Sequence, residues 1–218
     1  MNTVAGRDFE GLHAHCSLDH CVTRSLRRQA QSGDYSFTSC SFTPRFRLPE
    51  GRLVPYTCVM DIRSVLRLLK NMDEQGVDYV LVGAAALSIL GIVRATEDVD
   101  LFVDPAPENV ERLRTALRAT WNDPSIEDIR TEDLAGDYPV IRYGPPGEAF
   151  TVDILSRLGE AFRFPDLQWE TKDIEGIPVR VATPATLYRM KSTTVRLQDR
   201  ADAAQLKERF GVGDDDAG

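Results

Sequence analysis

The chain has 218 residues, of which 42% are hydrophobic, and a formal net charge of −8. This is enough chain for one domain with a real core, with or without an appendage, and the acidic balance excludes a broadly basic coat for nucleic acid. No apolar run approaches the roughly 20 residues of a membrane helix, and the N-terminus lacks the apolar stretch of a secretory signal. The four cysteines form no regular framework, so we expect a soluble protein of the reducing cytoplasm with no membrane partner.

Residues 1–59 differ in composition from the rest of the chain, being richer in Ser, Arg, His and Cys with weak periodicity. His13, His15 and His20 lie here, close to Cys16 and Cys21. These are zinc ligands by type, but adjacent His-Cys pairs with no second well-spaced pair fit a zinc site poorly. We therefore predict a poorly organised N-terminal extension without function, and a natural start at residue 60 is an alternative that the sequence leaves open.

From residue 60 the pattern becomes regular. Asp61 is a good N-cap for a helix with a wide apolar stripe, and Gly76 closes that helix. The short apolar run Tyr79–Val82 predicts a buried strand, and Gly83 with the alanines after it predicts a tight turn into a second helix.

The next predicted strand, Asp98–Val103, carries the motif D-x-D. Side chains alternate along a strand, so the carboxylates of Asp98 and Asp100 point to one face. Two carboxylates side by side repel each other unless a cation lies between them. A strand, a glycine turn at a helix start and a D-x-D strand together suit a metal-bound triphosphate.

Downstream, residues 121–136 are polar and turn-rich, with Trp121 predicted as a packing anchor rather than a stacking platform. Asp153 lies within an apolar strand, where a carboxylate is costly to bury without a partner. It is either a surface residue of a half-exposed edge or a third acidic ligand beside the D-x-D pair. The other predicted elements are a helix at Glu108–Ala119, strands at Pro139–Tyr143 and Ala149–Leu155, and a hairpin of Asp166–Lys172 with Ile177–Val181.

Thr183 and Pro184 are a strong helix start, and helical pattern continues to about Phe210. In one unbroken helix a basic face would form, and it is either a solvated face or a nucleic-acid contact. Residues 211–218 are expected to be an acidic, disordered tail. The four residues of that face would be Arg189, Arg196, Arg200 and Lys207.

The run V-G-A-A-A-L-x₃-G-x₂-R-A-T-E-D-V-D-L-F-V, the later V-D-I-L and the segment K-S-T-T-V-R-L-Q-D-R-A-D resemble the minimal nucleotidyltransferases, particularly the AbiEii-type and MenT-type toxins of type IV toxin–antitoxin systems. The resemblance covers about residues 60–210. It implies an α+β fold with a DNA polymerase β-like palm, that is, a mixed β-sheet flanked by helices, followed by a C-terminal helical segment.

The resemblance also implies roles for individual residues. Asp98 and Asp100 would ligate one or two Mg²⁺ ions, with Asp153 completing the set. The amides at the glycine turn would receive the β- and γ-phosphates, and a late lysine would neutralise triphosphate charge. Arg94 would contact phosphate or brace the strand. Asp199 and Asp202 match acidic positions where a structural role is equally expected. The phosphate and charge roles fall on Gly83, Ala84, Ala85 and Lys191.

The implied reaction moves a nucleoside monophosphate from an NTP to a macromolecular hydroxyl, with the tRNA 3′ end as favoured acceptor and a cognate antitoxin as partner. Two alternatives stay open: transfer to a protein hydroxyl, and a catalytically weak module that acts by binding as an antitoxin or regulator. One departure bears on this choice, because Ala84 stands where the family usually has glycine or serine. Alanine keeps the backbone donor and loses a hydroxyl, which puts efficiency in doubt more than capacity.

Overall fold

The structure is a computed structural model that describes residues 45–47, 53–55, 61–136 and 139–213. The zinc reading of the N-terminal histidines therefore lies outside the described residues, as does most of the expected extension and of the acidic tail. Within residues 45–55 two short strands, β1 (Arg45–Arg47) and β2 (Leu53–Pro55), pair antiparallel.

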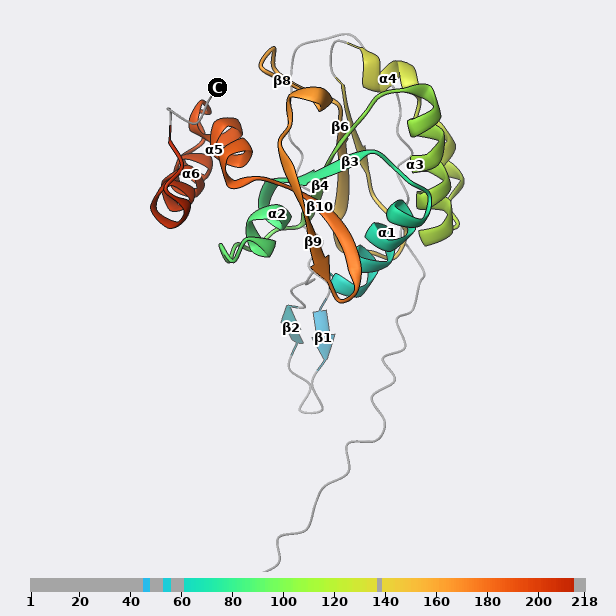
Figure 1. The fold of residues 1–218 in the computed structure, drawn as a ribbon. Helices are drawn as coiled ribbons and strands as arrows, with labels where there is room; N and C mark the ends of the chain where they lie inside the picture. The colour runs from blue at the N-terminus through green and yellow to red at the C-terminus, as the bar shows by residue number, and fades with distance from the viewer. Residues whose placement is uncertain (1–44, 48–52, 56–60, 137–138, 214–218) are drawn as a thin grey trace, which may run out of the picture. The chain divides into compact units, whose positions relative to one another are not determined.

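The centre of the molecule is a mixed six-stranded sheet with the strand order β5-β6-β4-β3-β10-β9 (Figure 1). The pairs β4–β6 and β3–β10 are parallel, and the other three pairs are antiparallel. This confirms the expected α+β fold with a mixed sheet flanked by helices. The strands are β3 (Tyr79–Val82), β4 (Asp98–Val103), β5 (Val140–Tyr143), β6 (Thr151–Leu155), β9 (Trp169–Ile174) and β10 (Ile177–Ala182).

Helices connect and cover these strands. Helices α1 and α3 pack against each other, and α1 also contacts β10, while α5 and α6 pair at the end of the chain (Figure 1). Their bounds are α1 (Ile62–Glu74), α2 (Gly83–Ile89), α3 (Pro107–Thr120), α4 (Thr131–Ala135), α5 (Pro184–Ser192) and α6 (Leu197–Phe210), with 3₁₀ turns η1 (Pro124–Asp128) and η2 (Phe164–Asp166) and a two-stranded ribbon of β7 (Arg157–Leu158) and β8 (Phe162–Arg163).

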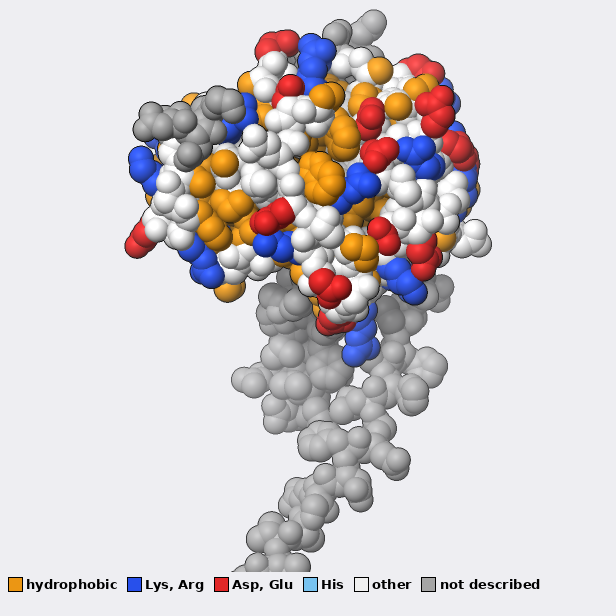
Figure 2. Space-filling view, in the orientation of Figure 1, with side chains coloured by type: hydrophobic (Ala, Val, Ile, Leu, Met, Phe, Trp, Pro, Cys, Tyr) orange, Lys and Arg blue, Asp and Glu red, His pale blue; other side chains and the backbone are white. Residues whose placement is uncertain are grey.

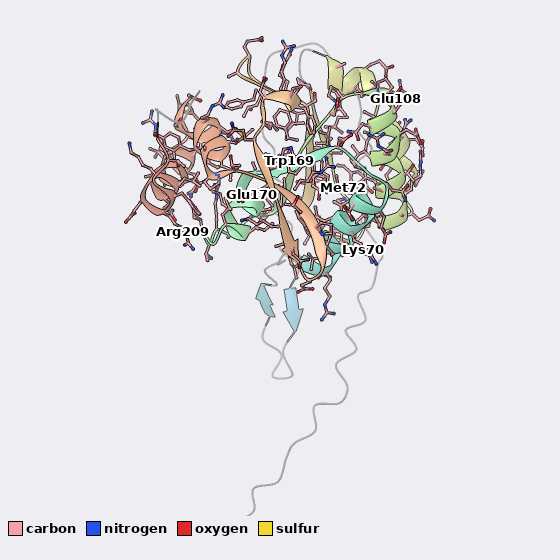
Figure 3. All side chains as sticks on the ribbon, viewed as in Figure 1. Lys70, Met72, Glu108, Trp169, Glu170 and Arg209 are labelled. Atoms are coloured by element: carbon pink, nitrogen blue, oxygen red, sulfur yellow. The ribbon has the colours of Figure 1, made fainter. Side chains whose placement is uncertain are left out.

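Helix α1 shows how local sequence sets the architecture. The Asp61 carboxylate accepts a hydrogen bond from the Arg63 amide at 3.0 Å, which caps the first turn as predicted. Met72 is fully buried in the core while Lys70, two residues before it, is exposed to solvent (Figure 3). An amphipathic stripe of this kind packs one helix face on the sheet and leaves the other in water.

The helical segment predicted from Thr183 to Phe210 is present as two helices, so the condition of one unbroken helix is not met. Residues 193–196 break it into α5 and α6. The break lets the Lys191 ammonium donate to the Asp199 carboxylate at 2.9 Å, whereas eight residues along one straight helix would separate their backbones by about 12 Å. The shared basic face therefore does not form, because Arg196 precedes α6 while Arg189 belongs to α5.

Other differences from the predictions are smaller. The polar segment 121–136 contains η1 and α4, and the strand expected from Asp166 begins only at Trp169 because Pro165 lies in η2. The prediction for Trp121 is confirmed. Its ring is buried, and its centroid lies 5.9 Å from that of Tyr143 in an edge-to-face contact.

Candidate active site

The sheet brings the three predicted aspartates together. In the parallel pair β4–β6, Asp100 lies opposite Asp153, and Asp98 lies opposite Thr151. Residues opposite each other on neighbouring strands point to the same face, as do residues two apart on one strand. Asp98, Asp100 and Asp153 thus share one face, and the alternative of a surface-exposed Asp153 is wrong because this residue is only 8% exposed.

Gly83 allows the Asp100 carboxylate to approach the start of α2. Its φ of +66° lies in the left-handed region, and a Cβ added there would lie 1.9 Å from Asp100 Oδ2. Only glycine satisfies both conditions at low cost. The first turn of α2 is therefore built directly against the acidic cluster.

Ala84 is buried and Ala85 half-buried in that first turn. The amides of Gly83, Ala84 and Ala85 remain the predicted phosphate contacts. The seven residues of α2 make a small helix dipole, so any such contact would depend on the amides themselves. A hydroxyl in place of the buried Ala84 methyl would need an internal partner.

The acidic cluster is electrostatically strained. Burial first, and then the charges of Asp98 and Asp153, raise the pKa of Asp100 from 3.8 to about 7, with partial relief from Lys191 and Arg142. The hydroxyl of Thr96 donates a hydrogen bond to the Asp98 carboxylate. A cation bound at this place would stabilise the ionised form of a carboxyl group that resists ionisation among like charges.

Arg142 belongs to this site and was not predicted from the sequence. It lies opposite Asp153 in the antiparallel pair β5–β6, and its Nε and Nη2 donate to Asp153 Oδ1 and Oδ2 at 2.8 and 2.6 Å. Those hydrogen bonds, followed by the nearby carboxylates, raise the pKa of the guanidinium. The signal was weak, since an arginine on an edge strand reads as a solvent-facing residue unless the register of the hairpin is known.

Lys191 and Arg94, both expected near phosphate, belong instead to a buried ion-pair cluster. The Lys191 ammonium lies 2.9 Å from Asp199 Oδ1 and 2.8 Å from Asp202 Oδ2, and Arg94 also pairs with the Asp202 carboxylate. Asp202 is 1% exposed. The bracing role foreseen for Arg94 and the structural role foreseen for the late aspartates both match these contacts, while the phosphate roles of Lys191 and Arg94 stay predictions.

The donor set fits Mg²⁺ by chemistry. Carboxylate oxygens are its preferred protein ligands, and three carboxylates against one guanidinium leave two negative charges unmatched when all are ionised. Among the described residues, however, no group of three or more acidic, histidine or cysteine side chains stands ready to hold a metal. Both oxygens of Asp153 accept hydrogen bonds from Arg142.

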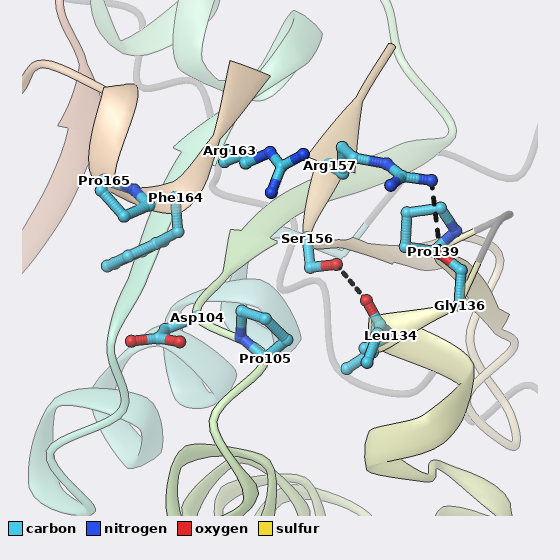
Figure 4. Close-up of a pocket in the computed structure, with 11 residues that line it drawn as sticks. Asp104, Pro105, Leu134, Gly136, Pro139, Ser156, Arg157, Arg163, Phe164 and Pro165 are labelled. Carbon is cyan, nitrogen blue, oxygen red and sulfur yellow. Dashed lines mark hydrogen bonds between the residues drawn. The ribbon is translucent and has the colours of Figure 1, made fainter. Parts of the chain in front are cut away.

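Two hollows help to place the site. One of about 940 Å³ adjoins Asp98 and is lined mainly by apolar side chains of α1 and α2. Another, of about 320 Å³, lies beyond the other end of β4, where Ser156 donates to the Leu134 carbonyl (Figure 4). Asp104 and Pro105 line the smaller hollow. A strand of this length separates its two ends by roughly 17–20 Å, so the smaller hollow lies away from the acidic cluster. Of that cluster, only Asp98 lines the larger hollow.

Of the helices that the structure describes, none is long and apolar enough to cross a membrane.

A sheet with clustered carboxylates beside a glycine turn is the layout that the resemblance to nucleotidyltransferases implies, and a family match assigns the chain to that class. The particular family follows from a family model, described as nucleotidyl transferase AbiEii toxin of a type IV toxin–antitoxin system, which matches residues 67–207. The chain therefore belongs to the AbiEii nucleotidyltransferase toxin family.

Solved structures similar to this chain include an antigenic nucleotidyltransferase-like protein from Paracoccidioides brasiliensis, with 17% identity, 67% of this chain and 74% of that chain covered and a TM-score of 0.44. The protein ANT(2″)-Ia, solved in complex with adenylyl-2″-tobramycin, has 16% identity over 72% of this chain and 93% of that chain, with a TM-score of 0.42. No curated protein matches the chain.

Proposed function

We propose that this protein is a divalent-metal-dependent nucleotidyltransferase that moves NMP from an NTP to a macromolecular hydroxyl. The observation that carries the proposal is the register of β4 and β6, which places Asp100 beside Asp153 on the face that Gly83 keeps open. Membership of a nucleotidyltransferase toxin family supports it.

In this proposal Asp98 and Asp100 hold Mg²⁺, and Asp153 joins them once Arg142 has moved. Bound there, the ion would supply charge stabilisation for the triphosphate and a lowered pKa for the attacking hydroxyl. The first turn of α2 would position the phosphates, and Lys191 would add positive charge at the pyrophosphate side.

The reaction forms a bond between the acceptor oxygen and the α-phosphorus. The bond from that phosphorus to the oxygen bridging the β-phosphate breaks, pyrophosphate leaves, and the hydroxyl proton passes to solvent. The described part of the chain contains no histidine, so the candidate site relies on its carboxylates and lysine rather than on an imidazole base.

We propose tRNA 3′ ends as the first acceptor to test, in the cytoplasm, with an antitoxin as the partner that restrains the activity; family membership supports this choice. The structure offers no separate argument for RNA, because the predicted basic face is interrupted. The face seen in Figure 2 carries lysine and arginine interspersed with aspartate and glutamate rather than a continuous basic area. Because no continuous basic area favours RNA, transfer to a protein hydroxyl is the second candidate.

The test is incubation of the purified protein with each of the four NTPs labelled at the α-phosphate, Mg²⁺ and either total RNA or total protein. We expect label on RNA that co-migrates with tRNA, abolished by EDTA and by Asp100→Asn. Label on protein would redirect the acceptor and keep the reaction. Label on neither, with any of the four NTPs, would contradict the proposed activity and favour a binding module.

A further inference from the structure

Arg142 has an unusual combination of contacts and exposure. Its guanidinium makes a two-point hydrogen-bonded pair with Asp153, at 2.8 and 2.6 Å, which is the strong geometry for this type of ion pair. The Asp153 side chain is 12% exposed, but that of Arg142 is 58% exposed. A mostly solvated arginine thus caps a mostly buried carboxylate.

The position of β5 explains how this arginine can be mobile. Strand β5 lies at the edge of the six-stranded sheet, outside β6. Its residues are largely in contact with solvent, and Val140 is itself 55% exposed. The guanidinium can therefore turn into water without removing any side chain from the core, and its hydration offsets part of the lost interaction.

The same guanidinium interacts with the whole acidic cluster. Besides its hydrogen bonds to Asp153, it is attracted electrostatically by the carboxylates of Asp98 and Asp100. A divalent cation at this face would bind oxygens of the same carboxylates. Each Asp153 oxygen already accepts a hydrogen bond from the guanidinium, so a metal ion bound there would repel the Arg142 charge at short range and compete with it for the same negative charge. The two cations are therefore alternatives at Asp153.

We propose that Arg142 is a built-in counter-ion that competes with the metal for Asp153 and is displaced when the metal binds. This inference rests on the proposed function for the existence of the metal site. In the metal-free protein the arginine reduces repulsion within the acidic cluster. On metal binding it turns outward, and its charge lies beside the site where a triphosphate would arrive.

The competition has a direct thermodynamic signature. Removing the arginine removes the competitor and leaves the cluster more negative, so metal affinity in the absence of nucleotide must rise. Since a hydrogen bond to a charged group contributes about 1.5–3 kcal/mol, loss of this competition corresponds to at least about tenfold tighter binding. Removal should also lower the stability of the metal-free protein, and saturating metal should reverse that loss.

The experiment is a calorimetric titration of the full-length, metal-free protein with Mn²⁺, without nucleotide, together with melting curves. The variants are Arg142→Gln, which removes the charge, and Arg142→Lys, which keeps the charge but cannot form the two-point hydrogen-bonded pair of a guanidinium. Arg118→Gln is the matched control, since Arg118 makes the same type of two-point pair with Glu127 on the surface, at 2.6 and 3.1 Å.

We expect Arg142→Gln to bind Mn²⁺ at least about tenfold more tightly than the parent, Arg142→Lys to fall between them, and Arg118→Gln to match the parent. Metal-free Arg142→Gln should melt below the parent and approach it when Mn²⁺ is saturating. Unchanged or weaker Mn²⁺ binding by Arg142→Gln, with Asp98→Asn abolishing binding, would overturn the counter-ion role and leave the proposed function intact. No Mn²⁺ binding by any variant would overturn both.

Discussion

Two clusters of buried charge lie close together in this protein, and their balance differs. At the acidic cluster of Asp98, Asp100 and Asp153, three carboxylates face one arginine. At the ion-pair cluster, two cations face two carboxylates, and every one of these four charges has a partner. The members of the second cluster are Arg94, Lys191, Asp199 and Asp202.

The difference separates paired charges that hold segments together from an excess of charge that would suit the metal ion of the proposed function. The balanced cluster joins the segment before β4 to α5 and α6, and buried charges of this kind persist when each is paired. The acidic cluster keeps an uncompensated excess of negative charge, and burial together with that excess raises the pKa of Asp100 to about 7. Such an excess costs stability unless a further cation arrives, which is what a metal site requires.

Lys191 connects the two clusters. It is 8% exposed and bound to Asp199 and Asp202. Its charge also offsets part of the rise in the pKa of Asp100. The helix break at residues 193–196 makes this arrangement possible. The predicted role of Lys191 at the triphosphate would therefore use a cation that the second cluster already holds in position.

The largest expected effect comes from removing a charge of the acidic cluster. Asp100→Asn should lower NMP transfer by roughly a thousandfold or more, because a metal ligand supports several kcal/mol of transition-state stabilisation. The same change relieves repulsion, so the metal-free protein should melt about 2–4 °C higher for each kcal/mol gained. Transfer of labelled NMP and a melting curve measure the two quantities.

Glu170→Gln is the control for this pair of measurements, because Glu170 is an acidic strand residue paired with Lys172 at 3.0 Å, outside the acidic cluster. It should change neither quantity. An Asp100→Asn protein that transferred NMP at the parental rate would remove Asp100 from the site, and one that melted lower would contradict the excess of negative charge.

Gly83→Ala should have the next largest effect. The new methyl group would collide with the Asp100 carboxylate, and the left-handed backbone costs about 1–2 kcal/mol for any residue with a Cβ. Gly76→Ala is a close control, because Gly76 has nearly the same φ, +63°, and no atom within 4 Å of the added Cβ.

Urea unfolding and NMP transfer should separate these two variants. Both should lose stability through the backbone, but only Gly83→Ala should lose transfer, by about a hundredfold if Asp100 is displaced. Equal transfer by both variants would show that the approach of Asp100 to α2 is unimportant for the reaction.

Asp202→Asn tests the balanced cluster. It leaves Arg94 and Lys191 without their shared buried partner, which should lower the free energy of unfolding by about 3 kcal/mol. A double-mutant cycle with Arg94→Met, followed by urea unfolding, isolates the coupling. Negligible coupling would mean that the two side chains do not depend on each other, and the cluster would then not fasten the C-terminal helices.

The acidic cluster was largely predictable from sequence, whereas the balanced one was not. Alternation along one strand is a local rule, so the shared face of Asp98 and Asp100 follows from their spacing. The position of Asp153 beside them needed the strand order, which the family resemblance supplied. The turn at Gly83 followed from the glycine and alanines after an apolar run, although its close approach to Asp100 did not.

The ion pairs of Arg142 and Lys191 depend on contacts between separate segments. The register of β5 on β6 decides whether an edge-strand arginine meets solvent or Asp153, and nothing in residues 140–143 encodes it. The helical pattern of residues 184–210 is interrupted at Thr193, Thr194 and Val195, three β-branched residues with modest helix propensity. Lys191 pairs with Asp199 and Asp202 across this break. Local propensity cannot report an ion pair that forms only after the chain folds.

The smallest expected effect comes from Asp199, at the more exposed side of the balanced cluster. Burial opposes ionisation of this carboxyl, but hydrogen bonds from Lys191 and Thr194 outweigh it and hold its pKa below the ordinary 3.8. Asp199→Asn should lower the free energy of unfolding at pH 7 by about 1 kcal/mol, since a neutral amide still accepts hydrogen bonds.

Because the pKa of Asp199 is lower in the folded than in the unfolded state, the carboxylate stabilises the fold above pH 3.8 and loses that contribution as the pH falls through the folded-state pKa. The difference between parent and variant in urea should therefore shrink towards pH 3, while transfer at pH 7 stays close to parental because Asp202 still holds Lys191. A difference that persisted undiminished in acid would mean that Asp199 stabilises the fold by packing rather than by its charge, and the contrast between the two clusters would then rest on Asp202 and its partners.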